Sequence, residues 1–169
     1  MRHWKLGLML FLLIVLLAAC GSSSGEMEVN DVWGRTSPMA AANGAFYMQI
    51  TNNTGEDDKL LSASTDACGT VELHEMYMKE GDVMGMRPVP DGYIALPKGE
   101  MVELKVGGLH VMCIGKNQEF NAGDSIPITL QFENAGTMEV TADIRDNADT
   151  PSMDMDMDGS GMEGMNNGG

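Results

Sequence analysis

The sequence predicts an all-β domain, an antiparallel β-sandwich, on the basis of three observations. Short runs of alternating apolar and polar residues are bounded by glycine, proline, asparagine and aspartate, which is the pattern of half-buried strands. No long segment has the helical period of about 3.6 residues. Seven or more such runs follow one another at short intervals, as is typical of β-sandwiches. We therefore expect residues 27–146 to form one domain, which is long enough to bury a core.

Each expected strand is identified by its local pattern. GAFYMQITN is rich in aromatic and β-branched residues, and GTVELHEMYM is joined to VMGMRPV by the turn KEGD. YIAL stops at Pro97, MVELKV alternates, and LHVMCIG follows a pair of glycines. SIPITLQFEN and TMEVTADIRD form a hairpin around NAG. We expect strands over 44–52, 69–78, 83–89, 93–96, 101–106, 109–115, 125–134 and 137–146.

The N-terminal segment is typical of an export signal. A basic head with Arg2 and Lys5 precedes 14 apolar residues, a run shorter than the about 20 residues of a membrane span. The letters LAAC, ending at Cys20, resemble the bacterial lipoprotein cleavage motif. Cleavage there would remove residues 1–19 and leave a lipid on Cys20, with 20–26 as a tether. The protein would then be extracytoplasmic, in the periplasm or on the outer face of the cell membrane; an ordinary signal peptide or a retained anchor is the alternative.

The net charge excludes some classes of partner. The chain has 10 basic and 25 acidic residues, a formal net charge of −15. Loss of Arg2 and Lys5 with the signal leaves 8 basic residues, and the net charge becomes −17. Such a protein repels nucleic-acid phosphates and anionic headgroups and concentrates cations. We therefore expect no nucleic-acid partner, although the acidity would also serve solubility alone.

Methionine is unusually frequent, whereas histidine is scarce. Without the signal, 15 methionines and two histidines remain. Methionine fills gaps in cores, but that does not explain methionines in polar segments. Each histidine is followed by methionine two residues later, in the triplets His74-Glu-Met76 and His110-Val-Met112. Residues i and i+2 of a strand share a face, so each histidine should project together with its methionine.

The turn at 79–82 should bring further thioethers toward the first triplet. In a hairpin of that length, Met84 or Met86 comes opposite 76–78 and close to His74. Two imidazoles and two or three thioethers could then converge on one ion. Thioether sulfur is soft and suits Cu(I), whereas zinc prefers thiolate, imidazole and carboxylate. These residue types predict a site for Cu(I), with weaker binding of Cu(II).

The same segments resemble a known family. VELHEMYMKEGDVMGMRPV followed by GLHVM is similar to the PCuAC family of periplasmic copper chaperones, and the resemblance extends over about residues 30–145, including GAFYMQITNN and LPKGEMVELKVGGLHVM. It implies a cupredoxin-like, immunoglobulin-like β-sandwich. It also implies hand-over of copper to an acceptor, typically subunit II of cytochrome c oxidase. The Cu(I) ligands that the resemblance implies are His74, Met86, His110 and Met112.

The implied ligand set departs slightly from the family pattern. The intervals on either side of Met86 look longer than usual, which added turn residues at 79–82 and 90–92 would explain. A shifted strand register would instead let Met84 or Met76 replace Met86. We therefore keep Met76 and Met84 as auxiliary copper-binding candidates.

Two cysteines lie within the expected domain. If the strands that carry the histidines pair antiparallel with the histidines near each other, Cys68 falls across from about residue 116 and near Cys113. A disulfide, which needs Cα atoms within about 7 Å, is then one interpretation. Two buried free thiols and a copper-binding role are the alternatives.

The C-terminal residues 147–169 form a tail of different composition. They contain no leucine, isoleucine, valine or aromatic residue, so we expect disorder. Methionines alternate there with aspartates, which indicates either a solubilising tail or an auxiliary copper binder that carries ions toward the folded site. The tail methionines are Met153, Met155, Met157, Met162 and Met165.

The leading functional prediction is a monomeric, non-enzymatic Cu(I) carrier, held at a membrane by its lipid. The alternative is a cupredoxin-type electron-transfer protein, which needs a cysteine thiolate beside two histidines. Cys113 follows Met112 but should project to the opposite face of the strand. A thiol reductant would need a Cys-x-x-Cys pair, which the sequence lacks, and a hydrolase would need a further histidine as base.

Overall fold

The computed structural model describes residues 25–81 and 83–146, and every regular element in these ranges is a β-strand. The described residues form no helix that is both long and apolar enough to span a membrane. The expected all-β class is confirmed, with strands β1 (Met27–Arg35), β2 (Asn43–Asn52), β3 (Asp58–Ser64), β4 (Cys68–Lys79), β5 (Val83–Pro88), β6 (Ile94–Leu96), β7 (Met101–Leu104), β8 (His110–Lys116), β9 (Ser125–Phe132) and β10 (Thr137–Arg145).

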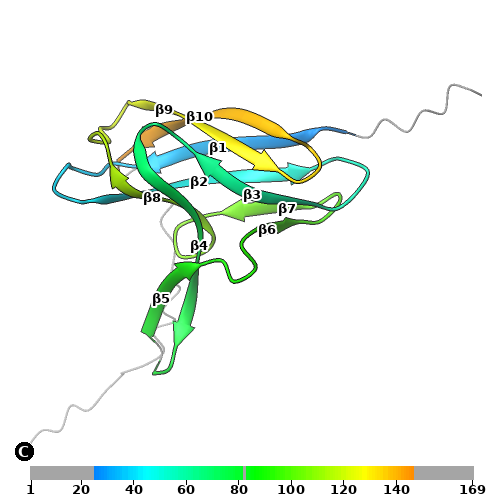
Figure 1. The fold of residues 1–169 in the computed structure, drawn as a ribbon, viewed down its shortest axis with the longest axis horizontal. Coiled ribbons are helices and arrows are strands. Elements are labelled where there is room, and N and C mark those ends of the chain that lie inside the picture. The colour runs from blue at the N-terminus through cyan, green and yellow to red at the C-terminus, as the bar shows by residue number, and fades with distance from the viewer. Residues whose placement is uncertain (1–24, 82, 147–169) are drawn as a thin grey trace, which may run out of the picture.

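These strands form one hydrogen-bonded sheet that folds over on itself into a sandwich (Figure 1). The strand order is β5-β4-β8-β2-β1-β10-β9-β3-β6, with β7 also paired to β2. Strands β3 and β4 lie far apart in this order but contact each other, because the two halves of the sheet share one core. The pairs among the described strands are antiparallel, as expected, except for β1 and β10, which run parallel.

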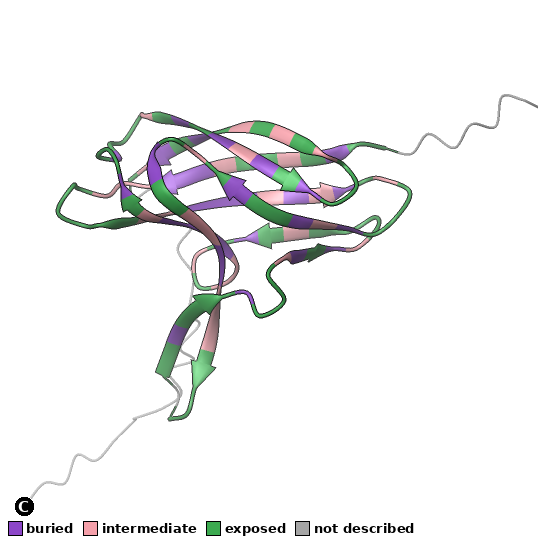
Figure 2. Cartoon of the chain, in the orientation of Figure 1, coloured by how far each residue is buried: buried purple, intermediate pink, exposed green. Residues whose placement is uncertain are grey.

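The core takes side chains from both halves of the sheet. Phe46 of β2 and Val111 of β8 are fully buried, and Leu130 of β9 is fully buried on the opposing half. Strand β9 buries every second residue, so its isoleucine, leucine and phenylalanine side chains point inward. Figure 2 shows the buried positions concentrated in the sandwich, whereas β5 is mostly exposed. The hairpin of β5 and the end of β4 therefore projects beyond the core (Figure 1).

All eight strands expected from the sequence are present, to within two residues at each end. Two further strands were not predicted. In β1 the pairing register shifts between Asn30 and Trp33, and Asp31 has a φ of 47°, so a bulge interrupts the alternation. Strand β3 has the sequence DKLLSAS. Aspartate, lysine and alanine are depleted in strands generally, so this sequence gives a weak strand signal.

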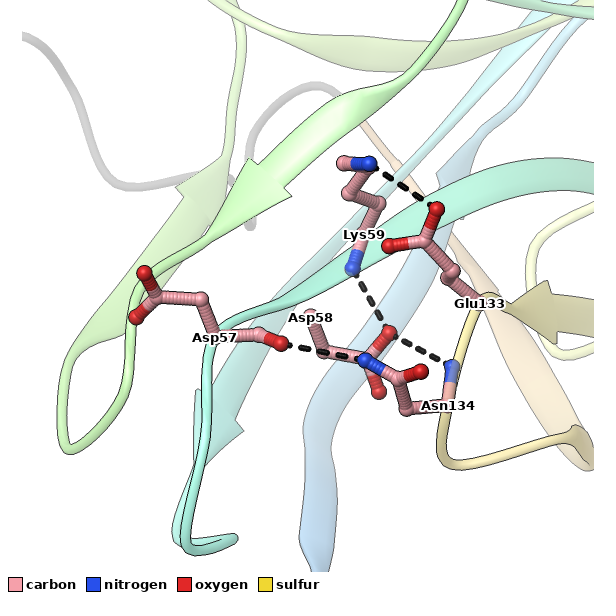
Figure 3. Close-up of polar contacts among 5 residues, drawn as sticks. All are labelled: Asp57, Asp58, Lys59, Glu133 and Asn134. Carbon is pink, nitrogen blue, oxygen red and sulfur yellow. Dashed lines mark hydrogen bonds and ion pairs between the residues drawn. The ribbon is translucent and has the colours of Figure 1, made fainter.

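A buried carboxylate ties β3 to the turn between β9 and β10 (Figure 3). The side chain of Asp58 accepts hydrogen bonds from the backbone N–H groups of Lys59 at 2.7 Å, Asn134 at 2.9 Å and Ala135 at 2.8 Å. Burial raises the pKa of Asp58, but these backbone donors outweigh it and hold the pKa below its usual value. The side chain of Lys59, which does not contact Asp58 in this way, forms an ion pair with Glu133 at 2.9 Å.

A disulfide joins Cys68 at the start of β4 to Cys113 of β8, with Cα atoms 5.5 Å apart. Cys68 lies opposite Lys116 in the strand register, as the sequence indicated. Both cysteines are buried in the core cluster. Of the alternatives left open by the sequence, the structure therefore contains the disulfide.

Candidate metal centre

Two imidazoles meet where β4 pairs with β8. His74 lies directly opposite His110 in the antiparallel register, and the ring centroids are 5.8 Å apart, edge to face. Both side chains are buried, with 7% and 4% of their surfaces exposed. The sequence predicted that these two histidines approach each other, and the strand register accounts for it.

The histidines occupy the face of the strands that points away from the core. Val111 and Cys113 belong to the core cluster. Met112, with 8% of its surface exposed, lies outside that cluster although it is buried. Strand alternation therefore places Met112 on the same face as His110. The prediction that His110 and Met112 project together is consistent with this geometry.

The hairpin register selects among the candidate methionines. Met86 of β5 lies opposite Met76, and Met84 lies opposite Met78, one step further along the hairpin. Only Met86 of these side chains has a polar contact with a histidine: its Sδ is 3.1 Å from His110 Nε2. The register thus favours Met86 over Met84 as the nearer thioether, with Met76 beside it.

The contacts of His110 fix which nitrogen carries the proton. Its Nδ1 is 3.0 Å from the backbone carbonyl of Gly108, and a carbonyl can only accept a hydrogen bond. Burial lowers the pKa of His110, and the nearby His74 lowers it further, so the ring is neutral at pH 7. Nε2 then presents a lone pair toward the sulfur of Met86. Two electron-pair donors face each other, an arrangement that a cation between them would stabilise.

His74 has the complementary tautomer. Its Nε2 is 2.7 Å from the Glu72 carboxylate, which can only accept when ionised, so Nε2 carries the hydrogen. Its Nδ1 is buried and has no hydrogen-bond partner. Metal-binding histidines commonly donate their second N–H to a carboxylate or a carbonyl in this way. In its neutral form, each ring therefore has one nitrogen that can bind a metal ion, while the other donates to an oxygen acceptor.

A pocket of about 360 Å³ opens beside the site. His110, Met112, Met76 and Met86 line it, and His74 does not. The lining residues that the sequence did not single out include Arg35 of β1 and Tyr47 of β2. The Tyr47 ring lies 6.3 Å from that of His110, and burial raises its pKa while the Arg35 charge opposes this.

The site offers only a few kinds of metal-binding side chain among the described residues. The described residues contain no group of three or more histidine, cysteine, aspartate and glutamate side chains that could hold a metal ion. Cys113 is bonded to Cys68 and offers no thiolate, so the site lacks the sulfur ligand of an electron-transfer copper protein. Imidazole and thioether remain, a combination that suits a soft monovalent ion. Outside the described residues lie Cys20 and the tail candidates Met153, Met155, Met157, Met162 and Met165.

A β-sandwich that gathers two histidines and several methionines at one rim has the architecture of the PCuAC domains. The chain belongs to the LpqE-like family, described as "Putative lipoprotein LpqE-like", which matches residues 27–144. This family match, together with the solved PCuAC domains that share the fold, confirms the resemblance to PCuAC proteins.

One of two curated relatives is a lipoprotein by name. "Putative lipoprotein Lxx21020" of Leifsonia xyli subsp. xyli is 29% identical over 128 residues, which are 75% of this chain and 74% of that protein. "Uncharacterized protein RP573" of Rickettsia prowazekii is 29% identical over 93 residues, 54% of this chain and 50% of that protein.

Solved structures share the fold. "Apo PCuAC domain from PmoF1" is 25% identical with a TM-score of 0.60, over 73% of this chain and 97% of that domain. The Cu(I) form of DR1885 from Deinococcus radiodurans is 25% identical with a TM-score of 0.60, over 77% of this chain and 87% of that one. "Copper-bound PCuAC domain from PmoF2" is 20% identical with a TM-score of 0.59, over 73% of this chain and 96% of that domain. This likeness indicates the fold alone.

Proposed function

We propose that this protein is an extracytoplasmic copper chaperone, a non-enzymatic carrier that binds one Cu(I) ion and hands it to an acceptor. The observation that carries the proposal is the 3.1 Å approach of His110 Nε2 to Met86 Sδ, beside the buried ring of His74. The solution structure of Cu(I)-bound DR1885, which shares the fold, supports copper as the ion. The proposed ligands are His74, Met86, His110 and Met112.

The charge of the donor set favours Cu(I). Imidazole and thioether are neutral, so the bound ion keeps its single positive charge without a coordinating anion. Thioether prefers the softer, monovalent ion, and Cu(II) would bind more weakly. Methionine needs no deprotonation, so only the two histidines couple binding to pH.

Unequal exposure of the ligands supports a carrier rather than a permanent copper centre. His74, His110 and Met112 are at most 8% exposed, whereas Met86 is 45% exposed and lies on β5, an edge strand of the sheet. An acceptor's donor atom can therefore replace the Met86 sulfur first, before the buried ligands release the ion. Transfer proceeds by ligand exchange, with no change in the oxidation state of copper.

The cellular setting follows from the N-terminal motif and the relatives. A lipid on Cys20 would hold the protein at a membrane, as the lipoprotein name of the Leifsonia relative supports. The proposed acceptor is the copper centre in subunit II of cytochrome c oxidase, and the proposed working form is a monomer. The tail methionines would act as an auxiliary copper binder.

A competition titration against a chromogenic Cu(I) chelator tests the proposed ligands. The variant His110→Ala, Met112→Ala should lose more affinity than the about 10–100-fold typical of changes next to metal ligands. Because Met112 is buried, Met86→Leu provides a second variant with little effect on folding. Met101→Leu, at a 53% exposed position on β7, is the control. Unchanged affinity in both site variants would refute the proposal.

A further inference from the structure

The β4–β5 hairpin carries four methionines in two consecutive cross-strand pairs. Met76 lies opposite Met86, and Met78 lies opposite Met84. Since alternate strand residues share a face, all four point to the side on which His74 lies. We call Met76, Met78, Met84 and Met86 the thioether ladder. It begins beside the two histidines and extends outward along the projecting hairpin (Figure 1).

The outer pair of the ladder is exposed to solvent. Met78 is 55% exposed and Met84 is 49% exposed, so neither contributes a buried side chain to the core. Exposed methionines scattered singly need no explanation. Met78 and Met84, in contrast, face each other near the tip of a hairpin and place two soft donor atoms close together.

The opposite face of the hairpin carries the contacts that stabilise it. Arg87 forms an ion pair with Glu75 at 2.8 Å, and its guanidinium lies 4.3 Å from the centroid of the Tyr77 ring. Lys79 also lies over that ring, at 6.0 Å. A Cβ at position 85 would come within 2.9 Å of the ring, so Gly85 leaves room for this packing. The hairpin is thus stabilised without the outer methionines.

We propose that Met78 and Met84 form a second binding site for soft monovalent ions, which loads the histidine–methionine site with Cu(I). This inference rests on the proposed function. The residues of a cross-strand pair have Cβ atoms about 4.5–5.5 Å apart, and methionine has three rotatable bonds, so both sulfurs can reach one ion. Two neutral donors bind weakly and leave coordination positions open for a ligand of the copper donor.

The ladder gives the ion a short route inward. Successive pairs on one face lie about 6.6–7 Å apart, a step that flexible thioether side chains can span. The ion passes from Met78 and Met84 to Met76 and Met86, and then to the histidines. At each step a new sulfur–copper or nitrogen–copper bond forms as an old one breaks. Copper remains Cu(I), and no proton or electron is transferred.

Nuclear magnetic resonance tests binding at the outer pair. The whole protein, labelled with ¹³C in its methionine methyl groups, is titrated with Ag(I), a redox-inert soft monovalent probe. We expect the Met78 and Met84 signals to shift together, whereas the signal of Met101, which is exposed opposite Thr51, stays in place at the same Ag(I) concentration. Unshifted Met78 and Met84 signals after the tight site is filled would overturn the inference.

Transfer kinetics test the loading role. Cu(I) is delivered from a chromogenic chelator to the whole protein, and the loss of colour is followed by stopped flow. In Met78→Leu, Met84→Leu we expect loading to slow about tenfold, because a nearby bound ion is present at millimolar effective concentration, while the equilibrium affinity stays unchanged. The matched control Met39→Leu, Met101→Leu removes two other exposed thioethers and should load at the normal rate. Equal loading rates in all proteins would overturn the loading role.

A further variant separates this inference from the proposed function. In His110→Ala, Met112→Ala the tight site should be lost, but the Met78 and Met84 signals should still respond to Ag(I). Tight binding that survives in this variant would contradict the proposed function. Loss of tight binding with no response at Met78 and Met84 would contradict only the loading site. If Met78→Leu, Met84→Leu does not fold, the single variant Met84→Leu provides the same kinetic comparison.

Discussion

Removal of the disulfide should destabilise the domain strongly and leave copper binding intact. Cys68→Ala, Cys113→Ala frees the unfolded chain of a cross-link between residues 45 positions apart. In the chain-entropy description, a loop of that length contributes about 4 kcal/mol to the free energy of unfolding. For a domain of about 120 residues, in which 1 kcal/mol shifts the melting temperature by about 4 °C, the expected loss is roughly 16 °C.

The assay is urea unfolding followed by the fluorescence of Trp33, which is only 7% exposed. Wild-type protein treated with a thiol reductant is the control, because it loses the same bond without a substitution. The Cu(I) affinity, measured below the unfolding range, should be unchanged, since the disulfide lies on the core side of β8 and the ligands on the other. An unfolding midpoint equal to that of the oxidised wild type would refute the entropic reasoning. A folded variant that no longer binds Cu(I) would refute the separation of the two faces.

Three further perturbations probe the site and the fold. Glu72→Ala removes the oxygen that orients His74 and should weaken Cu(I) binding about tenfold in a chelator titration. Glu72→Gln keeps an acceptor oxygen and should weaken binding much less. Equal losses of affinity in the two variants would argue against an orienting role for Glu72. Asp58→Ala leaves the backbone N–H groups that donate to this carboxylate without an acceptor. It should lower the free energy of unfolding, measured in urea, by about 2–3 kcal/mol. Asp58→Asn keeps one acceptor oxygen and should cause a smaller loss. Burial keeps the pKa of His110 below its usual value of 6.5, so the unfolded chain takes up the proton first as the pH falls. The stability of the copper-free protein should therefore decrease as the pH drops through that value. His110→Gln should flatten this part of the plot of urea midpoint against pH, and an unaltered plot would contradict the assignment.

The sequence predicted the two central features of the candidate site because both depend on local geometry. The i, i+2 spacing placed each histidine on the face of its methionine. The short turn after Lys79 fixed the β4–β5 register closely enough to bring Met86 opposite Met76. The pairing of β4 with β8, which sets His74 against His110, is non-local, and the resemblance to PCuAC proteins was needed to expect it.

Other parts of the site depend on contacts that no local pattern encodes. Arg35 reaches the pocket from β1, a strand hidden by its bulge, and Tyr47 looks like an ordinary aromatic residue of β2. Glu72 is one of 25 acidic residues, and only its 2.7 Å contact with His74 distinguishes it. The parallel pairing of β1 with β10 likewise joins the two ends of the domain and leaves no mark in either segment.

The direction of β1 sets which part of an anchored molecule would lie nearest the lipid. Strand β1 begins at Met27 and ends at Arg35, which lines the pocket and lies opposite Arg145 at the end of β10. About 25 Å of extended strand therefore separates the two ends of β1. A lipid attached ahead of Met27 would join the sandwich at the end of β1 remote from the pocket, and the rim with the histidines and methionines would stay open to approaching donors and acceptors.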